Sequence, residues 1–170
     1  MSDSSLISNE EKLVRILHKD WIVDGVLQTN AFALRNGETY ISVNRPSIDS
    51  FSNDVSDFVR KHTGYQVDDG SSFQQAVFNA GDVRGISVSF NQKTANLTVE
   101  VEPRDGNIKS HAGIFTRIEG NNIKGGSQQE VFIQDGQKVS YEAIHLKVQY
   151  ALLALSQLEK HKNINKEERI

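Results

Sequence analysis

Two short segments in the middle of the chain alternate apolar and polar residues. Every second position is apolar in both of them: Ile86, Val88 and Phe90 in the first, and Leu97, Val99 and Val101 in the second. Such alternation buries one face of a strand and leaves the other in water, which is typical of an antiparallel ribbon. With a further strand expected over 111–118 ("HAGIFTRI"), the pattern predicts an antiparallel sheet.

Three other segments have helical spacing of apolar residues. A capping-box pair, Ser8 and Glu11, precedes an apolar stripe and predicts a helix over about 9–19. Similar stripes predict a helix over about 50–62 and a long one over about 141–160. Together these patterns predict an α+β domain, with the helices covering a sheet of hairpins.

The boundaries of this domain follow from where periodic patterns begin and end. A single domain is expected over 9–160, with a flexible N-terminus at 1–8 and a flexible tail at 161–170. Within the domain, Asn36-Gly37 is a strong turn signal and predicts a hairpin over 31–43.

Composition restricts the class of protein. A formal charge of −3 and a pI near 5.9 do not favour general nucleic-acid binding. The chain has no cysteine, and neither a secretory signal nor a membrane-spanning apolar run is apparent. The expectation is a soluble cytoplasmic protein without membrane association. The histidines lack local metal-ligand spacing, so neither a metal nor a cofactor is expected.

His18 and His111 are the candidate catalytic residues. His18 ends the predicted first helix in "LHKDW", and His111 opens a predicted strand. Two convergent imidazoles could act as a general acid and base on a nucleotide-like or peptide substrate. In the alternative, both residues are structural: His18 is a histidine near a helix C-terminus, and His111 is a buried histidine bonded to a backbone carbonyl. No nucleophile elbow or phosphate-binding loop accompanies them.

Two resemblances extend this reading. The order Arg15, Ser42, Glu100 is similar to the Arg–Ser–Glu order of ADP-ribosyltransferase-like folds, where the three residues lie on separate strands and hold a nicotinamide cofactor. The predicted helix at Arg15 argues against that arrangement. The sequence also resembles a group of small bacterial proteins with no assigned activity, which implies no function. The matching positions are His18, Gly25, Ala31, Phe32, Ser42, Val43, His111 and Ala112.

The last predicted helix has a second apolar row, Leu146, Tyr150 and Leu153, at i, i+4, i+7 spacing. Two apolar faces on one helix imply two burial partners. The leading functional hypothesis is therefore a bacterial adaptor, accessory or immunity-type protein without its own catalysis. Its second row would bind another protein or a second copy of the chain. The competing possibility is that the first helix covers this row. The only tryptophan, Trp21, is expected to fill the junction between the first helix and the hairpin.

Overall fold

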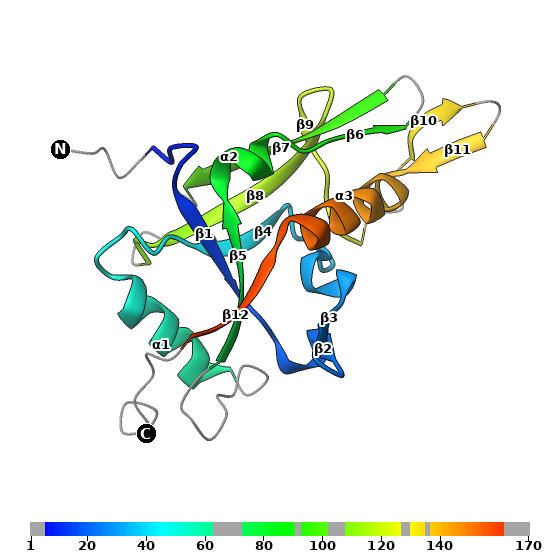
Figure 1. Cartoon of the computed structure of the whole chain (residues 1–170). Helices are drawn as coiled ribbons and strands as arrows, with labels where there is room; N and C mark the ends of the chain where they lie inside the picture. The colour runs from blue at the N-terminus through cyan, green and yellow to red at the C-terminus, as the bar shows by residue number, and fades with distance from the viewer. Residues whose placement is uncertain are drawn as a thin grey trace.

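An eight-stranded antiparallel sheet organises the computed structural model, which describes residues 6–62, 73–90, 93–101, 108–126, 130–134 and 137–161 (Figure 1). The strands are β1 (Lys12–Ile16), β4 (Tyr40–Asn44), β5 (Phe73–Asn79), β6 (Ser87–Phe90), β7 (Lys93–Val101), β8 (His111–Ile118), β9 (Asn121–Asn122) and β12 (Gln157–His161). Their order is β12–β5–β1–β4–β8–β7–β6, and β9 pairs with β8. The two strands predicted from alternation, now β6 and β7, are confirmed, and so is the further strand expected over 111–118, now β8.

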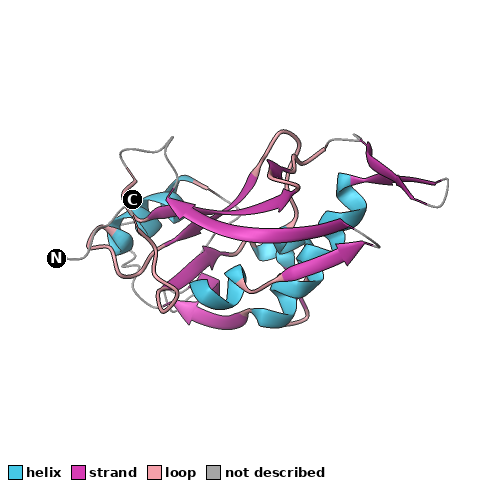
Figure 2. Ribbon diagram, turned by 90° about the horizontal axis from the view of Figure 1, so that it is seen from above, coloured by secondary structure: helices cyan, strands magenta, loops and turns pink. Residues whose placement is uncertain are grey.

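The remaining elements are short ribbons and helices. The hairpin β2 (Ile22–Val23) with β3 (Val26–Leu27) and the hairpin β10 (Glu130–Gln134) with β11 (Gln137–Ser140) lie apart from the main sheet. The α-helices are α1 (Phe51–Lys61), α2 (Ala80–Arg84) and α3 (Tyr141–Leu155), and the 3-10 turns are η1 (Lys19–Trp21) and η2 (Thr29–Phe32). The β10–β11 hairpin extends outward from the N-terminal end of α3 (Figure 2).

Helices cover both faces of the sheet around β1. Leu13 belongs to the main core, to which α3 contributes Val148 and Leu152. Val14, the next residue, packs with the buried face of α1 in a second core. Successive residues of a strand point to opposite faces, so α1 and α3 lie on opposite sides of β1. The fold is therefore mixed α+β with an antiparallel sheet and three α-helices, as predicted at the level of class.

The predicted helix over 9–19 is wrong, because Lys12–Ile16 forms β1. Leu13 and Val14 are both buried, one in each core. A strand buried on both faces has no alternation and is hard to distinguish from a short apolar helix. The Ser8–Glu11 pair caps no helix, because a strand follows it. The Glu11 carboxylate bonds to the Ser8 backbone and to Arg45 and Ser47 far along the chain.

Two other predicted elements differ from the structure. The hairpin over 31–43 does not form: the carbonyls of Ala31 and Phe32 accept hydrogen bonds from side chains, and only β4 is a strand. The helix predicted over 141–160 ends at Leu155, since 157–161 form β12 on the edge of β5. The middle helix is confirmed as α1.

The predicted flexible ends lie largely outside the described residues, which leave out 1–5 and 162–170.

A buried ion pair fixes the chain just before β1. Arg45 Nε and Nη2 donate to the two carboxylate oxygens of Glu11 at 2.6 and 3.1 Å, and Ser47 Oγ donates to Glu11 Oε1 at 2.6 Å. The two charged side chains are 3% and 9% exposed. Burial by itself raises the pKa of Glu11, but the hydrogen bonds from Arg45 and Ser47 and the Arg45 charge outweigh it and hold the pKa below its ordinary value.

We expect Glu11→Gln to lower the free energy of unfolding by about 3–5 kcal/mol, because it leaves the buried Arg45 guanidinium without its counter-charge. Urea denaturation at neutral pH measures the change. Asp57→Asn is the matched control: it removes an exposed partner of Arg60 and should cost about 0–1 kcal/mol. Equal effects of the two substitutions would contradict the structural role of the buried pair.

A buried histidine joins α3 to η2. His145 is 5% exposed, and its Nε2 lies 3.1 Å from the carbonyl oxygen of Phe32. A carbonyl only accepts hydrogen bonds, so Nε2 carries the proton. Nδ1 is buried and has no hydrogen-bond partner within the described ranges, so protonating it would create an unpaired buried donor. Burial lowers the pKa of His145 from 6.5 to about 4, although the bond to Phe32 opposes the shift.

The low pKa of His145 predicts a loss of stability in mild acid. The unfolded chain takes up a proton near pH 6.5, whereas the folded chain does so only near pH 4. Stability is therefore retained above pH 6.5 and falls as the pH drops toward 4, by about 3 kcal/mol in total. The measurement is the free energy of unfolding against pH. His145→Gln should flatten this part of the profile, and an unchanged slope would show that other groups cause it.

Candidate functional site

The sheet opens between β1 and β4. These two strands share one register pair, Val14 opposite Asn44, whereas β1 and β5 share five. On its other side, β4 continues to pair with β8 from Tyr40 to Asn44. Beyond the single pair, β1 and β4 therefore separate, and the backbone groups that face the gap need other partners.

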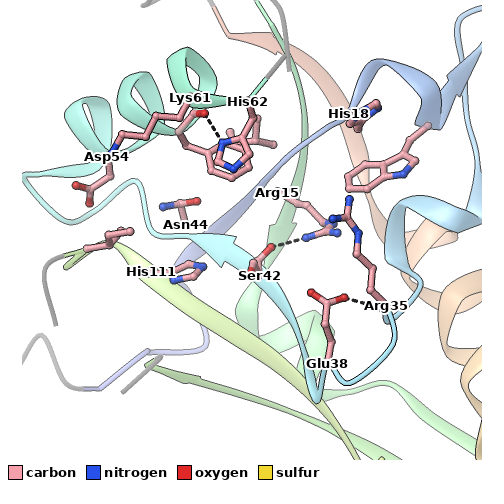
Figure 3. Close-up of a pocket in the computed structure, with 14 residues that line it drawn as sticks. Arg15, His18, Arg35, Glu38, Ser42, Asn44, Asp54, Lys61, His62 and His111 are labelled. Atoms are coloured by element: carbon pink, nitrogen blue, oxygen red, sulfur yellow. Dashed lines mark hydrogen bonds between the residues drawn. The ribbon is translucent and has the colours of Figure 1, made fainter. Parts of the chain in front are cut away.

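Arg15 supplies such partners within the gap. Its Nη1 donates to the Ser42 carbonyl oxygen at 2.8 Å, and its Nε donates to the Ala31 carbonyl oxygen at 2.7 Å. The guanidinium carbon lies 4.8 Å from the ring centre of Trp21, a cation–π contact. One side chain thus connects β1, β4 and η2 at the position where the strands separate (Figure 3).

A cavity of about 670 Å³ lies beside this opening. Its walls come from β1, η1, β4, α1, the start of β8 and the loop that precedes β4. Three basic side chains line it, Arg15, Arg35 and Lys61, against two acidic ones, Glu38 and Asp54. The lining is therefore net positive although the chain as a whole is net negative.

Three histidines also line the cavity. His18 is 25% exposed and its Nδ1 accepts a hydrogen bond from the backbone N–H of Asp20 at 3.1 Å. His111 packs edge-on against Tyr40, with ring centres 6.4 Å apart. His62 stacks on Phe58, with ring centres 4.3 Å apart.

His18 and His111 line the same cavity at opposite ends of it (Figure 3). His111 pairs with Asn44, which pairs with Val14, and His18 follows Val14 by four residues. Two strand spacings and four extended residues place the two backbones about 16 Å apart. The structure thus brings the histidines to one cavity with Arg15 and Ser42 between them, and does not place them side by side (Figure 3).

A hydrogen-bond network fixes α1 against the sheet on one side of the cavity. Asp54 Oδ2 accepts from Ser110 Oγ at 2.6 Å and from Ser50 Oγ at 2.8 Å. Asn44 Nδ2 donates to Ser110 Oγ at 3.0 Å. Ser110 is fully buried, so its hydroxyl positions other groups and is closed to a ligand.

The Arg15, Ser42, Glu100 order does correspond to three strands, β1, β4 and β7. Ser42 and Glu100 both pair with Gly113 of β8, so they lie on one face about two strand spacings apart. Tyr40 covers Gly113 closely, since a Cβ there would lie 2.8 Å from the ring. Glu100 instead accepts a hydrogen bond from Arg117 at 3.0 Å and does not line the cavity.

Trp21 lies at the junction between β1 and the β2–β3 hairpin, in place of the expected helix–hairpin junction. It packs against the main core and is only partly buried. It also lines the cavity, which makes it a structural residue and a wall of the site at once.

The second row of α3 is partly exposed. Leu146 and Tyr150 are 48% and 60% exposed, whereas Leu153 packs against the main core. The predicted first helix cannot cover this row, because that segment is β1.

Several cavity residues were not predicted from the sequence, namely Arg35, Lys61, Phe58 and His62. They come from a loop and from the end of α1. Their only signal in the sequence is that Phe58 and His62 are one helical turn apart, a spacing that also fits a structural pair.

In comparisons with known proteins, no family model matches the chain, and no match was found among curated proteins or solved structures. Within the described ranges, no helix is long and apolar enough to cross a membrane. Across the same part of the chain, no three His, Asp or Glu side chains gather as metal ligands.

Proposed function

We propose that this protein binds a nucleotide-like ligand in the cavity between β1, β4 and α1. The observation that carries this proposal is the lining itself: net positive charge combined with two aromatic side chains. An inward excess of positive charge in a net-negative protein favours an anionic ligand and increases its local concentration. Arginine side chains also match the geometry of phosphate oxygens.

The aromatic side chains support a ligand that contains a planar ring. Trp21 and Phe58 stand in different walls of the cavity, one beside η1 and the other on α1. Stacking of a base on an aromatic side chain contributes about 1–3 kcal/mol and tolerates different bases. A volume of about 670 Å³ is within the usual range for small-molecule sites.

Under this proposal the ligand is a substrate and His18 and His111 are its proton-transfer groups. They act from opposite ends of the cavity, so each serves a different part of the ligand. Both side chains are partly exposed, whereas the buried histidine, His145, binds a backbone carbonyl.

The single tryptophan gives a direct test of binding. Titration with each of the four ribonucleoside 5′-monophosphates should change Trp21 fluorescence saturably, because the indole lines the cavity. Incubation with nucleotides, followed by chromatography, tests turnover. The double variant His18→Gln, His111→Gln should keep binding and lose conversion. An absence of binding by fluorescence and by calorimetry would contradict the proposal. Binding of a nucleotide without its conversion would contradict only the catalytic role of His18 and His111.

A second function, binding of another protein or a second copy through α3, is favoured by one observation. Leu146 and Tyr150 are large apolar side chains that remain about half exposed on adjacent turns. Exposed apolar side chains that form a patch often mark interaction surfaces.

We expect the double variant Leu146→Glu, Tyr150→Glu to remain folded, because both positions are exposed. If α3 binds a partner, the variant loses assembly in light scattering or loses its partner in a pull-down. The matched control is Leu153→Glu, which should destabilise the fold because that side chain packs on the core. A monomeric wild type that captures no partner would contradict this second function.

A further inference from the structure

Two guanidinium groups point toward the same end of the cavity. Arg15 is held by the carbonyls of Ala31 and Ser42 and by the Trp21 ring. Arg35 extends from the loop before β4 toward it, and both line the cavity (Figure 3). Like charges that converge repel each other, and this arrangement is favourable when an anion lies between them.

The carboxylates of the cavity do not neutralise Arg35. Glu38 Oε1 accepts a hydrogen bond from the backbone N–H of Arg35 at 2.6 Å, and no ion pair joins Glu38 to the Arg35 guanidinium in the described part of the chain. Asp54 is engaged at the other end by serine side chains. Arg35 is exposed, so its guanidinium is accessible to a ligand.

The α1 wall of the cavity has a different chemistry. Phe58 lies on α1, and His62, one helical turn later, is its C-terminal cap. Their rings are stacked with an interplanar angle of 27°. A stacked pair covers the two ring faces that meet and leaves an outer ring face against which a planar heterocycle can pack. The cavity therefore has two guanidinium groups on one side, beside Trp21, and a stacked pair of rings on the α1 wall, beside Lys61 (Figure 3).

We infer that the ligand lies in a fixed direction, with its phosphate between Arg15 and Arg35 and its base against Phe58 and His62. This inference rests on the proposed function and adds the direction of binding and the residues that recognise each part. Arg15 is held by two backbone carbonyls, whereas the Arg35 side chain is exposed. The Arg35 guanidinium can donate two parallel hydrogen bonds to phosphate oxygens, and Arg15, whose Nε and Nη1 already bind backbone carbonyls, contributes its fixed positive charge.

The test compares three probes: adenosine 5′-monophosphate, adenosine and ribose 5-phosphate. Binding is followed by Trp21 fluorescence and by calorimetry. Arg35→Gln should lower the affinity for the monophosphate and for ribose 5-phosphate about tenfold or more, because a charge-assisted hydrogen bond is lost. The affinity for adenosine should not change. Phe58→Leu should lower the affinity for the monophosphate and for adenosine, and the affinity for ribose 5-phosphate should not change. Lys147→Gln, which removes one exposed charge from α3, is the control and should change none of them.

The results distinguish the direction of binding from binding itself. Equal weakening of all three probes by Arg35→Gln, or no weakening of the monophosphate, overturns the assigned direction while binding itself stands. Equal wild-type affinities for adenosine 5′-monophosphate and adenosine would also overturn the assigned direction. If the wild type binds none of the probes, the proposed function and this inference both fail.

Discussion

The separation of β1 from β4 is the constraint on which the rest of the structure depends. One register pair joins the two strands, and Arg15 then replaces strand pairing as the connection between them. The cavity exists because the sheet opens there, and its residues come from both sides of the opening. Arg15 thus links the stability of the fold to the chemistry of the site.

Strands with one buried face could be predicted from their period of two. Strands buried on both faces, such as β8 and β1, have no such period, and the segment of β1 was wrongly predicted as a helix. The alternating segments correspond to β6 and β7, since a sheet with one wet face imposes a period of two. Consecutive buried residues at Leu13 and Val14 gave no such period, because α1 and α3 cover opposite faces of β1. The edge strand β12 was also missed. Its pairing with β5 depends on long-range contacts that local pattern does not encode.

Part of the candidate site followed from residue type alone. His18 and His111 were chosen because histidine is a versatile proton-transfer group, and both line the cavity. Their separation could not be predicted, since it depends on the register across β1, β4 and β8. Arg35 and Phe58 were missed because their place in the site depends on how a loop and α1 pack against the open sheet.

We propose that the opening in the sheet, and not the exposed row of α3, is the principal functional surface. The most direct test is a two-dimensional ¹H–¹⁵N NMR titration with adenosine 5′-monophosphate, which reports on every backbone amide at once. The account predicts that the largest shifts occur at Ser42, His111 and the Trp21 indole N–H, with Leu146 and Tyr150 unaffected. Shifts confined to α3, or none at a millimolar excess of nucleotide, would contradict it.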